Sequence, residues 1–151
     1  MTQVVKPSNI EDQVLSFMRQ AGQLGEIGYP HFYSDLRQNR WEMLMGTHGE
    51  IMEYMVAEAR DDLVEAVDGL IDSMWVMMGT LLTYVGADCA RDLMNEVARA
   101  NLSKVDGSLA PLELNDKGKV VKPEAWEPPD IEGILNRHGW KLNENGTPIS
   151  D

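Results

Sequence analysis

Two sets of acidic side chains stand at helical spacing near the middle of the chain. Glu50 and Glu53 are three residues apart, so on an α-helix they lie about 60° apart on one side. Glu65, Asp68 and Asp72 follow at positions i, i+3 and i+7 and share one face of a second helical segment. Carboxylate oxygens that face one another form a cage for a hard divalent cation. The spacing therefore predicts a metal site built by two consecutive helices.

The second acidic set flanks an apolar stripe on the same segment. On a helical wheel of residues 63–85, one arc carries Leu63, Val67, Leu70, Met74, Met78, Leu81 and Val85. Asp68 and Asp72 lie at the edge of this arc, close to Trp75. Carboxylates beside a core stripe are costly to desolvate unless a positive charge compensates them. The position of these two acids therefore favours a bound cation.

Some of these acids also have an ordinary structural interpretation. Asp62 and Glu65 have the spacing of a capping box, so Glu65 could simply stabilise a helix start, where the helix dipole favours an acid. Asp68 and Asp72 lie beyond the first helical turn, so this explanation does not cover them. The prediction of a metal site therefore depends on the two sets together, and the role of Glu65 stays open between ligand and cap.

A second group of candidate residues is basic and lies downstream. Asn101 and Lys104 are three residues apart on a predicted helix, and Lys119 and Lys122 follow in the stretch Gly-Lys-Val-Val-Lys-Pro. Lysine ammonium groups act as point charges toward phosphate oxygens. The alternative is an ordinary solvated patch. In a chain of net charge −12, these bases cluster where bases are otherwise sparse, and the sequence leaves both interpretations open.

Other catalytic chemistries find little support in the sequence. His31, His48 and His138 do not follow a glutamate by three residues, so the Glu-x-x-His pairs of a di-metal redox bundle are missing. No Ser-His-Asp or Cys-His arrangement and no phosphate-binding glycine loop is recognisable. The single Cys89 excludes an internal disulfide and a cysteine-rich zinc site, and is best interpreted as a small buried residue.

The composition is that of one globular domain. The chain has 151 residues, of which 43% are hydrophobic and 25% charged, enough for a core of its own. The net charge of −12 argues against binding to a nucleic-acid backbone, although a bound metal can invert the local field for a nucleotide. The N-terminus lacks an apolar signal segment, and the apolar run at 73–85 is too short to span a membrane. We expect a cytoplasmic protein, in the host cell cytoplasm if the source is a virus.

The apolar periodicity predicts an all-α fold with four main helices. The first follows a cap at Ser8 or Asn9, and a long second helix runs from Tyr33 or Ser34 to Val56. Gly46 and Gly49 weaken that second helix or allow close helix contact. The third helix begins after Asp62. The fourth follows the turn at 86–88, where Asp88 can cap it, and ends at 101–104.

A loop-rich tail follows the fourth helix. It contains a possible hairpin around Gly118 and a short helix at 130–138, and residues 141–151 look frayed. We therefore expect one domain over residues 1–140. The predicted helix at 73–85 is apolar almost all the way round, and four helices of one chain cannot cover every side of it. This favours an obligate homo-oligomer.

Four stretches form a pattern that is found in a known family: Glu50-x-x-Glu53, Asp68 to Asp72 running into Ser-Met-Trp-Val, Glu96 to Lys104, and Gly118 to Leu135. Through them, residues 40–135 resemble the MazG-like, all-α nucleoside triphosphate pyrophosphohydrolases, in particular the small bacteriophage members that are similar to phosphoribosyl-ATP pyrophosphohydrolase. Two departures stand out. Gly69 occupies the position of the first acid of the later pair, with Asp68 one residue before it, and Gly49 replaces the first half of a double glutamate.

The resemblance implies a four-helix bundle-type fold that cleaves an NTP between the α- and β-phosphates to NMP and pyrophosphate. It also implies two or three Mg²⁺ or Mn²⁺ ions per site, and a homodimer or homotetramer in which helices of two chains build each site. Glu50 and Glu53 match the family's metal ligands, and Asp72 matches the acid of the later motif. Glu53 is then the carboxylate that orients or deprotonates the attacking water.

The resemblance also implies how the rest of the substrate is held. The phosphate-binding positions of the family are matched by Asn101, Lys104, Lys119 and Lys122. The base would be recognised by Phe17, Tyr29 and Phe32 or by Trp75. Nothing in the sequence reads out a base, so dGTP or another deoxynucleotide is a family-level expectation. The alternative interpretation is a non-catalytic helical assembly protein whose acids are solvated faces, which would bind no Mn²⁺.

Overall fold

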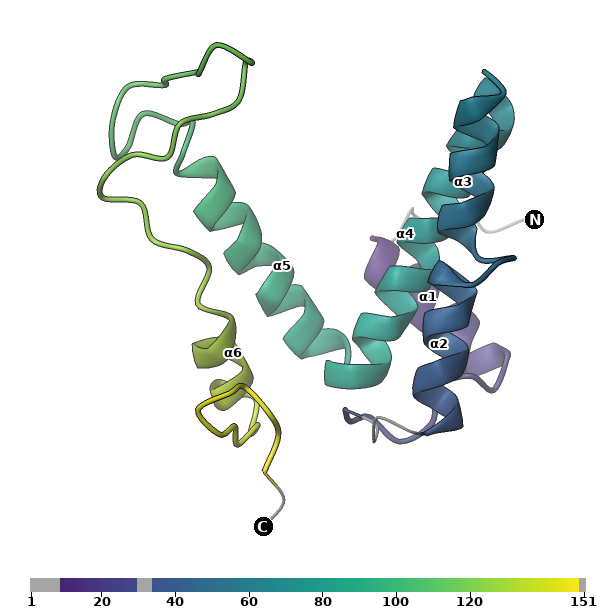
Figure 1. The fold of residues 1–151 in the computed structure, drawn as a ribbon. Helices are drawn as coiled ribbons and strands as arrows, with labels where there is room; N and C mark the ends of the chain where they lie inside the picture. The colour runs from purple at the N-terminus through teal and green to yellow at the C-terminus, as the bar shows by residue number, and fades with distance from the viewer. Residues whose placement is uncertain (1–8, 30–33, 150–151) are drawn as a thin grey trace, which may run out of the picture. The chain divides into compact units, whose positions relative to one another are not determined.

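The computed structural model describes residues 9–29 and 34–149, and within them the chain is helical with no β-strand (Figure 1). The helices of these residues are α1 (Ile10–Gln20), α2 (Asp35–Met45), α3 (Glu50–Ala59), α4 (Leu63–Val85), α5 (Ala87–Leu102) and α6 (Ile131–Arg137). The predicted all-α class is confirmed. The chain divides into two compact units, Met1–Ala87 and Asp88–Asp151, and each is described by itself. A single domain over residues 1–140 stays a prediction.

Side-chain caps explain where α1, α2 and α4 begin. The Asn9 side chain accepts a hydrogen bond from Asp12 N at 3.1 Å, and Ser34 Oγ accepts one from Arg37 N at 3.3 Å. Asp62 Oδ1 accepts from Glu65 N at 3.1 Å, which confirms the predicted start of α4. Each cap joins residues three positions apart, so the signal for these starts is local.

The predicted long helix from Ser34 to Val56 is wrong, because the chain breaks between α2 and α3. Gly46 N donates the last helical hydrogen bond of α2 to Glu42 O at 3.0 Å, and Gly46 then adopts an extended ψ of 172°. A Cβ atom at Gly49 would lie 2.7 Å from the carbonyl carbon of Leu44. Only glycine allows the backbone to fold back this closely, so the glycines end the helix instead of merely weakening it.

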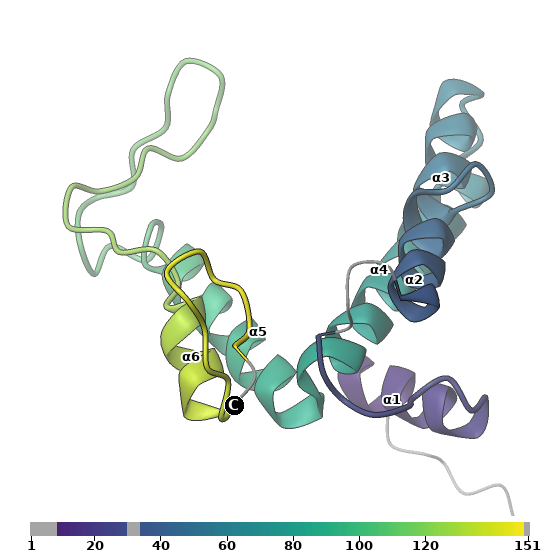
Figure 2. The same cartoon turned by 60° about the horizontal axis from the view of Figure 1, so that its bottom comes forward.

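In the first unit, α4 is the helix against which α1, α2 and α3 pack (Figure 2). The buried residues of α4 are mostly small: Ala66, Gly69, Ser73, Gly79 and Thr83, with Met78 and Leu82. A Cβ atom at Gly69 would lie 2.9 Å from both N and Cα of Tyr54 on α3. The absence of a side chain at Gly69 therefore lets the backbones of α3 and α4 come into contact.

The predicted apolar arc of α4 is not the packed face, and this corrects the sequence interpretation. Leu63, Val67, Leu70 and Met74 have 75%, 48%, 45% and 51% of their surface exposed, and of the arc only Met78 is buried. The reason is the close approach of α3, which selects the small-residue face. We call the exposed large residues the apolar face of α4: Leu63, Val64, Val67, Leu70, Ile71, Met74 and Met77.

In the second unit, α6 lies alongside α5 (Figures 1 and 2). Asp130 N donates to Glu96 Oε1 at 2.9 Å, and His138 Nε2 lies 2.7 Å from Asp92 Oδ2. The predicted short helix at 130–138 is confirmed. So is the turn around Gly118, which an antiparallel bridge between Leu114 and Val120 closes.

The tail beyond α6 differs from the frayed end expected at 141–151. Leu142 and Pro148 form a second antiparallel bridge, and Asn143 N donates to Thr147 O at 2.9 Å. Residues 150 and 151 lie outside the described part. Across residues 9–29 and 34–149, no single helix is long and apolar enough to cross a membrane, although α4 and α5 taken together meet those criteria of length and composition.

Candidate active site

The structure brings four of the five predicted metal-binding acids together. Glu50 and Glu53 stand in the first turn of α3, and Asp68 and Asp72 stand one turn apart on α4. Burial, followed by the charges of Glu53, Asp72 and Asp68, raises the pKa of Glu50. Burial, then the charges of Asp68 and Glu53, likewise raises the pKa of Asp72. We call Glu50, Glu53, Asp68 and Asp72 the acid cluster.

The helical hairpin explains why these four acids meet. Helices α3 and α4 run side by side on either side of the turn at Arg60–Asp62 (Figure 1). Glu50 stands eleven residues before Asp61 and Asp72 eleven residues after it. Because both helices rise about 1.5 Å per residue, positions equally far from the turn lie at the same height. Helix α3 also starts here, and its dipole favours acids in the first turn.

The departure at Gly69 has a physical reason in this hairpin. An acid at this position would place its Cβ atom 2.9 Å from the backbone of Tyr54, so the helices would have to separate. Ser73, the next residue on the same face, is also buried, and its Oγ donates to Gly69 O at 2.6 Å. Asp68, one residue earlier, carries its carboxylate without requiring the hairpin to widen.

One observation indicates that the acid cluster is suited to a divalent cation. Glu50 Oε2 is buried and has no hydrogen-bond partner among the described residues. A buried charged acceptor without a partner is costly, and oxygen atoms of this kind are the ligands of Mg²⁺ and Mn²⁺. In the described part of the chain, no three His, Cys, Asp or Glu side chains stand in a ready-formed metal-binding arrangement.

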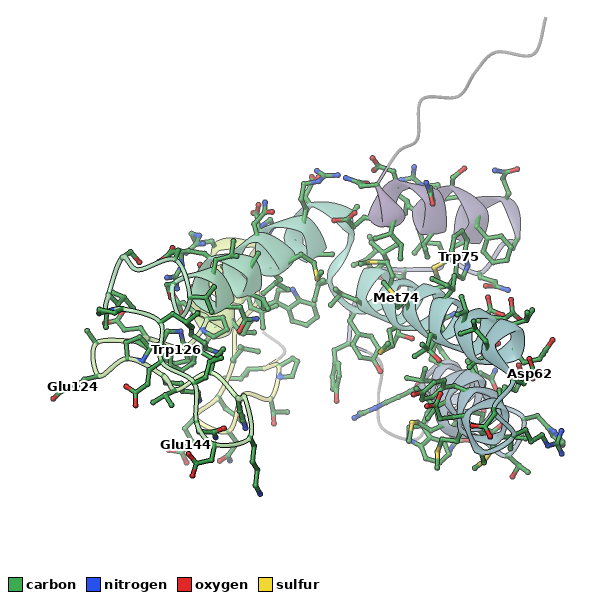
Figure 3. The ribbon with its side chains drawn as sticks, turned by 90° about the horizontal axis from the view of Figure 1, so that it is seen from above. Asp62, Met74, Trp75, Glu124, Trp126 and Glu144 are labelled. Atoms are coloured by element: carbon green, nitrogen blue, oxygen red, sulfur yellow. The ribbon has the colours of Figure 1, made fainter. Side chains whose placement is uncertain are left out.

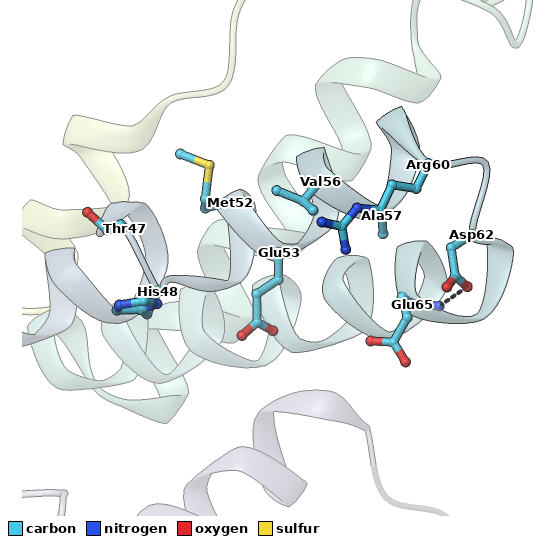
Figure 4. Close-up of a pocket in the computed structure, with 9 residues that line it drawn as sticks. All are labelled: Thr47, His48, Met52, Glu53, Val56, Ala57, Arg60, Asp62 and Glu65. Carbon is cyan, nitrogen blue, oxygen red and sulfur yellow. Dashed lines mark hydrogen bonds between the residues drawn. The ribbon is translucent and has the colours of Figure 1, made fainter.

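Glu65 stands apart from the acid cluster. It lies only four residues after Asp61, so in the hairpin it stands opposite Ala57 and well before Glu53. Its backbone N–H donates to Asp62, which supports the role at the helix start. Glu65 and Glu53 nevertheless line one cavity of about 340 Å³, and Figure 4 shows both carboxylates pointing to the same side. A ligand role for Glu65 stays a prediction.

Trp75 lies one turn beyond Asp72, beside a second cavity. Its ring meets Phe17 edge-on, with centroids 5.7 Å apart and planes at 73°. The cavity has about 170 Å³ and is lined by Val14, Phe17, Met18, Gln23, Arg40, Met43, Trp75, Val76 and Gly79. Of the other aromatic candidates, Tyr29 packs against Tyr84 at 5.0 Å, and Phe32 lies outside the described residues.

Arg40 is a residue of this cavity that sequence reasoning missed. Only 7% of its surface is exposed, and burial lowers the pKa of its guanidinium. Nη2 donates to Val76 O at 2.8 Å and Nε to Thr80 Oγ1 at 3.1 Å, so Arg40 ties α2 to α4. Nothing in the sequence separates it from an ordinary exposed arginine, because its partners lie thirty-six and forty residues away.

The predicted phosphate-binding residues lie in the second unit. Lys104 Nζ donates to Asn101 Oδ1 at 2.9 Å. Lys104 and Lys122 each place Nζ 4.5 Å from the ring centroid of Trp126. Lys119 belongs to the turn around Gly118, and no contact between its side chain and this ring is found in the described residues. Trp126 was not predicted as a site residue. The sequence signal for it is its position four residues after Lys122, close to one of the predicted phosphate-binding lysines.

Comparisons with known proteins leave the family as a prediction. No protein-family model matches this chain, and no curated protein is detectably similar to it in sequence. The argument for function therefore depends on the residues and their geometry.

Proposed function

We propose that this protein is a metal-dependent nucleoside triphosphate pyrophosphohydrolase with a MazG-like four-helix arrangement. It cleaves a (d)NTP between the α- and β-phosphates to (d)NMP and pyrophosphate. The observation that supports this most is the acid cluster, and within it the buried, unpartnered Glu50 Oε2. A folded chain gains nothing from gathering four acids at a helix contact unless a cation compensates them.

In this proposal each acid has a stated role. Glu50, Glu53, Asp68 and Asp72 hold two or three Mg²⁺ or Mn²⁺ ions, with Glu65 as a further candidate ligand. Bound cations of this kind neutralise phosphate charge and lower the pKa of a coordinated water. Glu53 orients the attacking water and accepts its proton, because its side chain is exposed. Glu50, whose Oε2 atom is buried, supplies a fixed oxygen.

The remaining predicted residues hold the substrate. Asn101, Lys104, Lys119 and Lys122, all in the second unit, bind the phosphates. Trp75, with the 170 Å³ cavity beside it, takes the base. The cavity begins one turn of α4 after Asp72, which suits a nucleotide whose phosphates lie at the acid cluster. Among bases we expect a deoxynucleotide, with dGTP tested first.

The apolar face of α4 supports a homodimer or homotetramer. Its large side chains remain exposed in the single chain, with Leu63 and Val64 at 75% and 76%. Contiguous exposed apolar surface of this kind marks an interaction site. The same observation also favours the alternative, a non-catalytic helical assembly protein. The two differ in one respect, since only the enzyme should gain thermal stability from Mn²⁺ plus nucleotide.

A substrate screen with identified products tests the proposal. All dNTPs and NTPs are incubated with Mg²⁺ or Mn²⁺, and nucleoside monophosphate plus pyrophosphate is expected. Nucleoside diphosphate plus orthophosphate, or no turnover of any nucleotide, would contradict it. Glu53→Gln and Asp72→Asn should each lower kcat by about 10²-fold or more while the chain stays folded. Glu58→Gln, an exposed acid on the same helix, is the matched control.

A further inference from the structure

Two lysine ammonium groups lie over the indole ring of Trp126, the residue labelled in Figure 3. Lys104 and Lys122 each lie 4.5 Å from the ring centroid, so their nitrogens are no more than twice that distance apart. Within the described residues, neither lysine forms an ion pair with a carboxylate, although the chain carries a net charge of −12. Two positive charges held close together without a counter-ion favour the binding of an anion from solution.

The surroundings of the ring explain how the two ammonium groups stay together. The negative face of an indole attracts each cation. Asn101 Oδ1 accepts a hydrogen bond from Lys104 Nζ at 2.9 Å, and the C-terminal end of α5, whose dipole favours cations, lies beside them. These contacts offset the mutual repulsion of the lysines, but none of them removes the positive charge.

Trp126 is itself fixed to the end of α5. Its Nε1–H donates to Ala100 O at 2.7 Å, across 26 residues of sequence. That carbonyl lacks its ordinary helical donor, because Lys104 N donates to Asn101 O instead, and it also accepts a hydrogen bond from Ser103 Oγ at 2.8 Å. The indole therefore brings the segment of Lys122 onto the helix end that carries Lys104.

We propose that Trp126 is a positioning residue whose ring holds Lys104 and Lys122 as one unit that binds the pyrophosphate part of the substrate. The identity of the anion as the β- and γ-phosphates rests on the proposed function. The positioning role rests on the contacts of the two ammonium groups with the ring. A purely structural Trp126 would cap α5 through its N–H and leave phosphate affinity untouched.

Binding of inorganic pyrophosphate, without metal, tests the inference by calorimetry on the full chain. Lys104→Gln and Lys122→Gln should each weaken affinity by about tenfold, and Trp126→Leu by about fivefold or more. Trp126→Phe keeps an aromatic face but loses the N–H donor, so its affinity should stay within about threefold of the wild type. Equal losses for Phe and Leu, or no loss for Leu, would overturn the positioning role.

A double-mutant cycle shows whether Trp126 acts through the lysines. In the Lys104→Gln/Lys122→Gln background, Trp126→Leu should add no further loss. Lys119→Gln removes the same charge from the same segment without touching the ring, so there Trp126→Leu should keep its full effect. An additive loss in the lysine-free background would overturn the inference, as would a Lys119→Gln loss equal to that of Lys122→Gln.

One further measurement keeps the outcome decisive. If Trp126→Leu does not fold, the indole N–H resonance of the wild type, assigned with Trp126→Phe, should shift on pyrophosphate titration, and an unmoved resonance would contradict the inference. Failure of the proposed function shows separately, because pyrophosphate binding needs no turnover. If the protein hydrolyses NTPs but its Trp126 variants bind pyrophosphate normally, only the positioning role of Trp126 is wrong. If the Trp126 variants bind pyrophosphate weakly but the protein hydrolyses no nucleotide, only the proposed activity is wrong.

Discussion

Replacement of Glu50 by glutamine should stabilise the metal-free protein. Glu50 is half-buried, Oε2 has no hydrogen-bond partner in the described residues, and three other acids face it. Glutamine has the same shape, keeps a polar group that can donate to Glu53, and carries no charge. The variant therefore isolates the cost of the buried negative charge from the cost of a cavity.

The size of the effect follows from burial without compensation. A buried charged acceptor that lacks a partner costs about 1–3 kcal/mol, and the partial exposure of Glu50 places it at the lower end, at about 1–2 kcal/mol. For a chain of this length, about 1 kcal/mol shifts Tm by about 2–4 °C, so Glu50→Gln should raise Tm by about 2–8 °C.

The direction of the pH dependence can be worked out from the same groups. Burial first, then neighbouring acids, raises the pKa of Glu50 from 4.5 and that of Asp72 from 3.8. The folded state therefore binds these protons more tightly than the unfolded state does. The stability they contribute is complete below the unfolded pKa values and is lost as pH rises through the raised folded ones. The advantage of Glu50→Gln over the wild type should accordingly be larger at pH 8 than at pH 4.

Thermal and urea unfolding of the wild type, Glu50→Gln and the control Glu58→Gln, in chelator and then in Mn²⁺, provide the measurement. In chelator Glu50→Gln should be the most stable of the three. In Mn²⁺ the order should reverse, because only chains with the full acid cluster gain stability from the bound ion. A Glu50→Gln chain less stable than the wild type at pH 8 in chelator would refute the reasoning, since the charge would then not be a cost.

Three further perturbations probe other parts of the molecule. Ile71→Glu places a charge on the apolar face of α4 and should turn an oligomer into a monomer in analytical ultracentrifugation; a wild type that is already monomeric would remove the basis for this. Arg40→Lys cannot reach both Val76 O and Thr80 Oγ1, so urea unfolding should show a loss of about 1–3 kcal/mol, and an unchanged midpoint would contradict the tie between α2 and α4. The Arg99 side chain, followed by the Asp130 N–H, lowers the pKa of Glu96 to about 2. Because the pKa of Glu96 is lowered, the stability that Glu96 contributes is present above pH 4.5 and is lost as pH falls through about 2. In the wild type, the α6 amides should therefore lose hydrogen-exchange protection over this pH range. In Glu96→Gln they should already lack that protection at pH 7.

The helix starts were predictable because their signals are local. Asn9, Ser34 and Asp62 each bond a backbone amide three residues on, which a single sequence displays directly. The break at Gly46–Gly49 was harder, since glycine inside an apolar pattern only weakens a helix on average. What decided it was the approach of Gly49 to Leu44, a contact that exists only once the chain has turned.

The packed side of α4 could not be read from a helical wheel. A wheel ranks residues by side-chain size and polarity, so it favoured Leu63, Val67 and Leu70 as the core. The hairpin is instead held by backbone approach at Gly69 and Ser73, where small side chains bring many atoms into contact. Large apolar residues left outside such a contact stay exposed, and the exposed apolar face of α4 is the basis of the proposed oligomer.

The distance of each acid from the turn at Asp61 predicts which acids meet, whereas the spacing along α4 alone does not. Along α4 alone, Glu65, Asp68 and Asp72 look equivalent, since all three share a face. Measured from Asp61, however, Asp72 and Glu50 are equally distant, and Asp68 lies seven residues after the turn against eight before it for Glu53. Glu65 is only four residues from the turn and has no acid opposite it. The turn thus separates the three acids of α4: Asp68 and Asp72 stand level with the acids of α3, whereas Glu65 stands close to the start of its own helix.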